Sequence, residues 1–320
     1  MVGKLTPDTE LSCSRLPAVM GLSPWSTPND ELAKTIDAMA GKTSTWNGNE
    51  ATRWGDRMER MILEEAATRL GVMLECPTVP FTAPGIKLNA SVDGIGHPVG
   101  EPFEIVTDPE RGIYVLGADS VIVDGPGILE SKLTQSAPED EPAAYRGPIQ
   151  LQGCMMCTGF NWGAVCVLYR GIEMRVFVYP KLQAVHDQIT DAVTQFERRK
   201  LGPDWYPPVS AADAARTWAT AEEDAPPVTL GADAAALVDD ILTAREVIKA
   251  SEATLEAASA ALMEMLGNHT EGIVTDDDGH QYRVRWPIRK YKAQPAKTQP
   301  AKEAYQVRLK TLEIKDLSTA

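Results

Sequence analysis

Apolar residues recur at helical spacing through the first seventy residues and again after residue 145. Residues 49–71 carry apolar side chains three or four positions apart and end at Gly71, a pattern that predicts an amphipathic helix. The same periodicity, with proline, serine or asparagine at the start and glycine at the end, predicts further helices. These cover residues 14–21, 23–41, 149–159 and 181–200.

Strand character dominates residues 73–133, where short β-type runs are separated by turns rich in glycine, proline and aspartate. Two more apolar runs, 162–171 and 174–180, are joined at Arg170 and Gly171 and predict a hairpin. Helices therefore come first, followed by a β-meander, a helix, a hairpin and a last helix. This order predicts an α/β core of about 200 residues.

The composition changes after residue 205. Residues 206–230 are rich in proline, alanine and acids, which is typical of a linker. A long helix is predicted next, because Ile241, Ile248, Leu255 and Leu262 recur every seven positions. This seam fits either packing on the chain's own core or self-association.

A hairpin with an Asp-Gly turn and a basic second strand is predicted after the long helix. We therefore expect four parts along the chain. They are a core at 1–205, a linker at 206–230, a long helix at 231–267, and a basic hairpin and tail at 268–320.

The net charge of −14 is unevenly distributed. Residues 201–280 hold 16 acids and 3 bases, whereas residues 281–320 hold 10 bases and 3 acids. The overall charge excludes a histone-like, polybasic binder. The concentration of basic residues in 281–320 is still compatible with a protein that acts on DNA.

Five cysteines fit a reducing cytoplasm better than a disulfide framework. No apolar run approaches the roughly 18 residues of a membrane span, and the first residues lack the apolar core of a signal peptide. We therefore expect a cytoplasmic protein without membrane contact. Cys154 and Cys157 form a C-x-x-C on a predicted helix, which we interpret as core packing rather than as iron–sulfur ligands.

The segment 119–132, DSVIVDGPGILESK, concentrates the candidate chemistry. A tight turn at DGPG would place Asp119 opposite Lys132, on the same face as Glu130. Two carboxylates suit Mg²⁺ or Mn²⁺, and a lysine beside them can activate a metal-bound water. The alternative is a surface ion pair between Glu130 and Lys132, which is the commoner meaning of Glu-x-Lys taken alone.

Two further acids lie upstream. Asp93 follows an alternating run in LNASVDGIG, and Glu59 lies in the middle of the helix predicted over 49–71. The plain alternatives are a turn aspartate and an acid on a solvated helix face.

Five segments, in this order along the chain, carry a family resemblance: SRLPAVMGLSPWSTP (14–28), NEATRWGDRMERMI (49–62), NASVDGIG (89–96), GPGILESK (125–132) and AYRGPIQLQGCMMCTG (144–159). They resemble the YqaJ-type phage recombinase exonucleases, relatives of the phage lambda exonuclease in the PD-(D/E)xK nuclease superfamily. The resemblance implies a restriction-endonuclease-like core, in which helices flank a central mixed β-sheet. The long helix and the basic hairpin would follow this core.

The same resemblance implies a Mg²⁺- or Mn²⁺-dependent exonuclease that degrades linear double-stranded DNA from 5′ to 3′. The 3′ single strands that remain would serve phage-type homologous recombination, with a single-strand annealing protein as partner. A homo-oligomer, specifically a trimer, and a phage or prophage origin in the bacterial cytoplasm are also implied. The alternatives are a structure-specific endonuclease of the same superfamily and a non-catalytic DNA-end-binding phage protein.

Residue roles follow from the same resemblance. The metal ligands would be Asp93, Glu130 and the backbone carbonyl of Ser131. The catalytic residues would be Glu59, which supports the metal-bound water, Lys132, and Gln152 on the active-site helix. The DNA contacts in the core would come from Ser14, Arg15, Tyr145 and Gln150.

The chain departs from the family pattern in the position of its aspartate. The family aspartate usually lies much closer to the glutamate than Asp93 does here, so residues 97–118 look like an inserted hairpin. Asp119 has the expected spacing but lacks the S-x-D-G context. Context favours Asp93 and strand geometry favours Asp119, so both are candidates.

Basic and aromatic residues alternate beyond the turn of the C-terminal hairpin. This mixture suits contact with a DNA backbone and with unpaired bases. The alternative is pairing with the acidic helix of the same chain. The candidates for DNA contact are Arg283, Arg285, Trp286, Arg289, Lys290 and Lys292.

Overall fold

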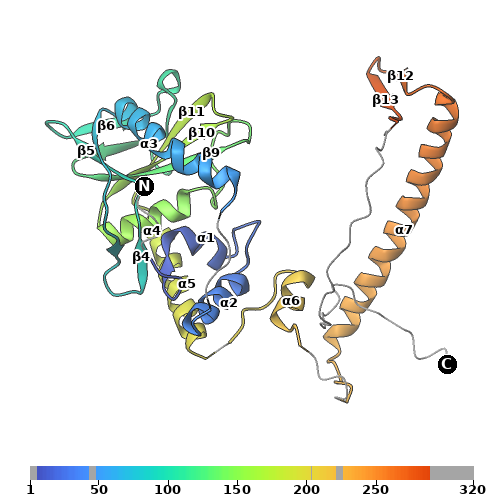
Figure 1. Ribbon diagram of the computed structural model, residues 1–320, viewed down its shortest axis with the longest axis horizontal. Helices are drawn as coiled ribbons and strands as arrows, with labels where there is room; N and C mark the ends of the chain where they lie inside the picture. Colours follow the sequence, from blue (N-terminus) through green and yellow to red (C-terminus); the bar gives the residue numbers. More distant parts are fainter. Residues whose placement is uncertain (1–5, 43–47, 203, 221–225, 289–320) are drawn as a thin grey trace, which may run out of the picture. The chain divides into compact units, whose positions relative to one another are not determined.

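The structure, a computed structural model, describes residues 6–42, 48–202, 204–220 and 226–288 (Figure 1). The chain divides into two units, Met1–Trp218 and Ala219–Ala320. The first unit combines helices with a mixed β-sheet, and the described part of the second contains a long helix and a hairpin. The α/β class expected from the sequence is therefore confirmed.

Capping residues set the ends of the helices in the first unit. Helix α2 (Pro28–Met39) begins at Thr27, whose side chain accepts a hydrogen bond from the Asp30 amide in a capping box. Helix α3 (Glu50–Leu70) ends at Gly71, which has a φ of 73° that glycine adopts without steric cost. The remaining helices of this unit are α1 (Leu16–Val19), α4 (Pro148–Thr158), α5 (Gln183–Leu201) and α6 (Ala211–Thr217), with short 3-10 turns η1 at Cys13–Arg15 and η2 at Pro109–Arg111.

A six-stranded mixed sheet with the order β2-β5-β9-β10-β11-β7 forms the centre of the first unit (Figure 1). Strand β9 (Gly127–Thr134) runs parallel to β10 and antiparallel to β5. Its side chains alternate between the two faces of the sheet. Ile128 belongs to the core formed with α4 and α5, whereas Leu129 belongs to the core formed with α3. The other strands of this sheet are β2 (Val72–Glu75), β5 (Gly94–Pro98), β7 (Ile113–Val115), β10 (Trp162–Tyr169) and β11 (Glu173–Pro180).

Two small sheets complete the first unit. One joins β1 (Leu11–Ser12), β4 (Leu88–Ala90) and β3 (Phe81–Thr82). The other pairs β6 (Phe103–Val106) with β8 (Ser120–Val123).

The prediction of a hairpin between residues 119 and 132 is wrong. Strand β8 pairs with β6, with Val121 opposite Ile105, and β9 has hydrogen-bonded neighbours on both edges, β5 and β10. These partners come from distant parts of the chain and leave no edge of β9 for β8. The inserted hairpin expected over 97–118 does not form either. Its two strands pair with strands outside this segment, β6 with β8 and β7 with β11.

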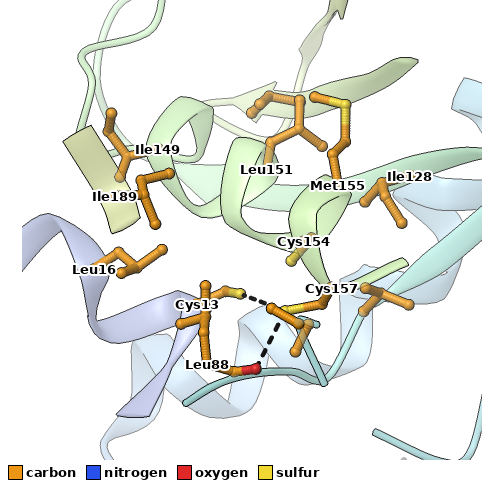
Figure 2. Packing of buried hydrophobic residues seen from close by; sticks show 14 of the residues in the cluster. Cys13, Leu16, Leu88, Ile128, Ile149, Leu151, Cys154, Met155, Cys157 and Ile189 are labelled. Atoms are coloured by element: carbon orange, nitrogen blue, oxygen red, sulfur yellow. Dashed lines mark hydrogen bonds between the residues drawn. The ribbon is translucent and has the colours of Figure 1, made fainter. Parts of the chain in front are cut away.

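Buried cysteines join η1 to α4 (Figure 2). The Sγ atoms of Cys13 and Cys157 lie 3.7 Å apart, and the thiol of Cys157 lies 3.5 Å from the carbonyl oxygen of Leu88. Cys154 is also fully buried. Burial, together with the neighbouring thiols, raises the pKa of Cys13 well above its ordinary value. The interpretation of the C-x-x-C as core packing is confirmed.

Part of the segment predicted as a linker is helical. Helix α6 begins at Ser210, whose side chain accepts from the Asp213 amide. The carboxylate of Asp213 is buried and accepts hydrogen bonds from Thr27 and Asn29 at the start of α2. A buried, hydrogen-bonded carboxylate therefore docks α6 on α2.

The second unit contains α7 (Asp233–Leu266), β12 (Glu271–Thr275) and β13 (Gln281–Arg285). The two strands are antiparallel, with Gly279 at a φ of 85° in the turn, so the predicted long helix and Asp-Gly hairpin are both present. The seam residues Ile248, Leu255 and Leu262 of α7 are exposed. No helix in the described ranges is both long and apolar enough to cross a membrane.

Candidate active site

Strand β9 presents Glu130 and Lys132 on one face, two positions apart. The Nζ of Lys132 donates to Glu130 Oε1 at 2.5 Å and to Gln150 Oε1 on α4 at 3.1 Å. Glu130 is only 1% exposed. Glu130 is therefore buried and Lys132 is partly buried, so the alternative of a surface ion pair does not hold.

Asp93 lies beside this pair at the start of β5. Its Oδ2 accepts a hydrogen bond from the Ser131 amide at 2.9 Å, and the next residue, Gly94, pairs with Leu129 of β9. The pairing of β5 with β9 therefore brings a residue that is distant in sequence next to Glu130. Asp119, in contrast, is exposed and precedes a strand that pairs with β6. The geometry favours Asp93 over Asp119.

The carboxylates share a crowded negative environment. Burial, followed by repulsion from Asp93, raises the pKa of Glu130 to about 8. Burial and the same aspartate raise the pKa of Glu59, on α3, to about 7. Burial opposes the charge of Lys132, but Glu130 and Asp93 together raise its pKa above its ordinary value. The single ammonium group of Lys132 therefore does not offset the negative charge that the three acids bring to this site.

This site fits a divalent cation by its chemistry. The Oε2 atom of Glu130 is buried without a hydrogen-bond partner, and carboxylate oxygens are the ligands that Mg²⁺ and Mn²⁺ prefer. Within the described ranges, no three His, Cys, Asp or Glu side chains already surround a common metal position. Oxygens of Glu130 and Asp93 instead accept hydrogen bonds from Lys132 and from the Ser131 amide.

Gln150, rather than Gln152, lies at this site. Gln152 is buried with its amide bonded to the backbone, donating to the Pro180 carbonyl and accepting from the Leu182 amide. Residues two apart on a helix point in different directions, so only one of these glutamines can face Lys132. The QLQ spacing in the sequence indicated that the two glutamines point in different directions. It did not indicate which of them faces the strand.

Arg15 is buried in the fold, so its proposed DNA contact gains no support from its position and stays a prediction. Its guanidinium is buried and donates to Glu31 Oε2 at 2.5 Å, to Thr35 Oγ1 at 2.7 Å and to nearby backbone carbonyls. Each nitrogen of this guanidinium therefore donates a hydrogen bond to a group inside the protein. Ser14 is exposed beside Ser12, and its proposed DNA contact stays a prediction.

Tyr145 lies at the entrance to α4. Its ring packs edge-on against Trp25 at 5.0 Å, and the Arg146 guanidinium lies 5.6 Å from its centre. Arg146 also bonds to Glu139 and to Ser136 in the loop that links β9 to α4. The sequence did not predict these contacts of Tyr145 and Arg146, because they depend on how that loop folds. The DNA contact of Tyr145 stays a prediction.

Two arginines of the basic C-terminal hairpin form ion pairs within the hairpin. The Nε atoms of Arg283 and Arg285 lie 3.4 and 3.3 Å from the Glu271 carboxylate on the adjacent strand, and Trp286 is exposed. The remaining candidates in the tail lie outside the described residues. They are Arg289, Lys290 and Lys292.

Substitution of the two glutamines is expected to separate chemistry from folding. Gln150→Ala should slow any reaction at the site and leave the melting temperature nearly unchanged, because this side chain is only partly buried. Gln152→Ala should lower the free energy of unfolding by about 1–3 kcal/mol, since two partly buried backbone groups lose their hydrogen-bond partner. Urea titrations alongside rate measurements check both. Equal losses of stability would contradict the assignment.

Metal-free protein is expected to lose stability as the pH rises from about 5 to 8. A carboxyl whose pKa is raised on folding binds its proton more tightly in the folded state. Its stabilising effect is therefore complete below the unfolded pKa and is lost as the pH passes the folded value, about 7 for Glu59 and about 8 for Glu130. Urea midpoints in EDTA should show this decline in the wild type and a smaller one in Glu130→Gln. Parallel curves for the two proteins would contradict the raised pKa of Glu130.

Comparisons with known proteins give three results. Two solved structures are similar in fold at low sequence identity. An alkaline exonuclease, LHK-Exo from Laribacter hongkongensis, is 16% identical, with 61% of this chain and 89% of that chain covered and a TM-score of 0.44. A phage-related exonuclease from Haemophilus somnus 129PT is 14% identical, with 60% and 93% covered and a TM-score of 0.39. No curated protein matches the chain.

A family model gives the third result. The YqaJ-like viral recombinase domain matches residues 8–161, a range that holds Glu59, Asp93, Glu130, Lys132 and Gln150. These are the residues that the fold gathers around β9. Residues 8–161 therefore match the YqaJ-like viral recombinase domain, the family that the motifs resemble.

Proposed function

We propose that this protein is a divalent-metal-dependent exonuclease that degrades linear double-stranded DNA from 5′ to 3′. One observation carries the proposal: the Glu130–Lys132 pair on β9 converges with Asp93, and the buried Glu130 keeps one oxygen unpaired. Carboxylates with an adjacent ammonium group suit hydrolysis of a phosphodiester, in which negative charge grows on the phosphate. The family domain supports a nuclease in phage recombination.

In this reaction water forms a new bond to phosphorus, one phosphorus–oxygen ester bond breaks, and the departing oxygen gains a proton. Glu59, with a pKa near 7, is suited to take the proton of the attacking water. Lys132 remains protonated and can donate a hydrogen bond to a phosphate oxygen, which stabilises the developing charge. Gln150 holds the ammonium group of Lys132 in place.

Asp93, Glu130 and the Ser131 carbonyl would hold the metal ion, which when bound supplies Lewis-acid polarisation of the phosphate. The chemistry of the donor set and the unpaired oxygen of Glu130 support this assignment.

The wider setting follows from the domain family. We propose DNA duplex ends as the substrate, 3′ single strands as the product, and a single-strand annealing protein as the next component. A homotrimer and activity in the bacterial cytoplasm belong to the same proposal.

The decisive experiment compares end-labelled linear duplexes with covalently closed circular DNA, each with Mg²⁺ and with EDTA. Linear DNA with a 5′ phosphate or a 5′ hydroxyl end should be degraded from that end only with Mg²⁺, and the closed circle should stay intact. Glu130→Gln serves as the inactive control. Cleavage of the circle would indicate an endonuclease, and intact linear DNA in every condition would indicate a DNA-end-binding protein.

A further inference from the structure

A pocket of about 440 Å³ opens next to the candidate active site. Its walls come from the first half of α3, from the end of β9 and from the turn between β10 and β11. Two lining residues lie close to site residues along their own elements: Met58 directly precedes Glu59 on α3, and Thr134 lies two positions after Lys132, on the same face of β9. The pocket therefore lies beside the residues of the candidate site.

The lining combines an aromatic wall with an apolar floor. Trp54 is 48% exposed, and the Arg57 guanidinium lies over its ring at 5.5 Å from the centre. Met58 and Leu133 also line the pocket, are partly buried, and pack on the core shared by α3 and the sheet. Gln135 adds an exposed amide, which can both donate and accept hydrogen bonds.

These features suit a flat ligand with polar edges. A phosphate group would need free cations, but Arg53 is paired with Glu50 and Arg57 covers the tryptophan. A planar aromatic ring can instead stack on Trp54, contact the thioether of Met58 and turn its polar edge toward Gln135. The volume lies within the range of small-molecule sites.

We propose that this pocket binds a nucleobase of the DNA strand being cleaved, and so positions the nucleotide adjacent to the scissile phosphate. The inference rests on the proposed nuclease function and adds a site to it. Every base has a stacking face, so this contact holds a strand without reading its sequence. Trp54 is a positioning residue in this scheme.

The test combines variants of the full-length protein with DNA that lacks single bases. Trp54→Ala removes the stacking wall, Trp54→Phe keeps a ring, and Met61→Ala is the control, because Met61 is an exposed apolar residue of α3 outside the pocket. Each protein receives linear duplexes that are intact or carry one abasic nucleotide at the first, second or third position from the 5′ end. Cleavage in one turnover is measured with Mg²⁺, and single-strand binding is measured by fluorescence anisotropy in EDTA.

Trp54→Ala should lose about tenfold to a hundredfold in single-strand affinity and in cleavage of intact DNA, whereas Trp54→Phe and Met61→Ala stay close to wild type. At one abasic position the wild type should fall to the level of Trp54→Ala, and that variant should lose nothing more. Equal losses by Trp54→Ala at every abasic position, or no loss on intact DNA, would overturn the proposal.

The two proposals fail in different ways. Binding that depends on Trp54 in a protein that cleaves nothing would refute the nuclease and retain the pocket. Cleavage and binding that are indifferent to Trp54 would refute the pocket and retain the nuclease.

Discussion

Asp93→Asn is expected to lower the rate of DNA cleavage by about 10³-fold, whereas Asp119→Asn should leave it within about twofold. Asp93 accepts the Ser131 amide and lies beside Glu130, so its charge belongs to the site. Asp119 is exposed ahead of a strand that pairs with β6. The asparagine at position 93 can still accept the Ser131 amide, so the loss should come from the missing charge and not from unfolding.

Asp93→Asn also has an expected effect that does not depend on cleavage. Asp93 raises the pKa of both Glu130 and Glu59 by repulsion. Its neutralisation should lower both values and raise the melting temperature of the protein in EDTA at pH 8. Single-turnover cleavage and thermal melts of both variants provide the measurements. An active Asp93→Asn together with an inactive Asp119→Asn would transfer the metal site to Asp119.

Lys132→Met should abolish most of the activity, with a loss of about 10³-fold in rate and little change in affinity for DNA ends. The methionine preserves much of the side-chain volume but removes the ammonium group that contacts Glu130 and Gln150. Glu130 then loses its positive neighbour, so its pKa should rise further and the group should remain protonated. A neutral Glu130 would also bind a metal ion less well.

The matched control for this variant is Lys87→Met. The Lys87 side chain is 77% exposed and lies 3.7 Å from Glu197, away from the residues of the site. It should keep wild-type rates, which separates the loss of one particular ammonium group from a general loss of positive charge. Anisotropy with labelled duplex ends in EDTA measures binding, and single-turnover digestion measures the rate. A Lys132→Met protein with more than about one tenth of the wild-type rate would exclude an essential role for the lysine.

Local patterns in the sequence were sufficient to predict the helices and, within the site, the meeting of Glu130 and Lys132. Helix α3 follows from its apolar spacing and from Gly71, whose left-handed conformation ends it. The meeting of Glu130 and Lys132 follows from strand alternation alone, because side chains two apart on a strand share a face. The hairpin of β10 and β11 and the Asp-Gly turn of β12 and β13 follow from short-range turn chemistry.

Long-range pairing decided the rest. Local geometry favoured Asp119, since the DGPG turn suggested that β8 and β9 would pair. In the tertiary structure, β5 and β10 occupy both edges of β9, and β5 carries Asp93 to the site. The choice between adjacent and distant strands depends on the burial of whole faces of the sheet, which turn residues do not encode.

The sequence by itself therefore determined which residue types are available for the chemistry and, through five motifs, which family the domain resembles. Only the tertiary structure decided which aspartate joins Glu130, that Gln150 rather than Gln152 contacts Lys132, and that Arg15 is buried in a structural network. The physical reason is the same in each case. Spacing along the chain specifies the face on which a side chain lies, whereas strand order and helix docking specify what that face meets.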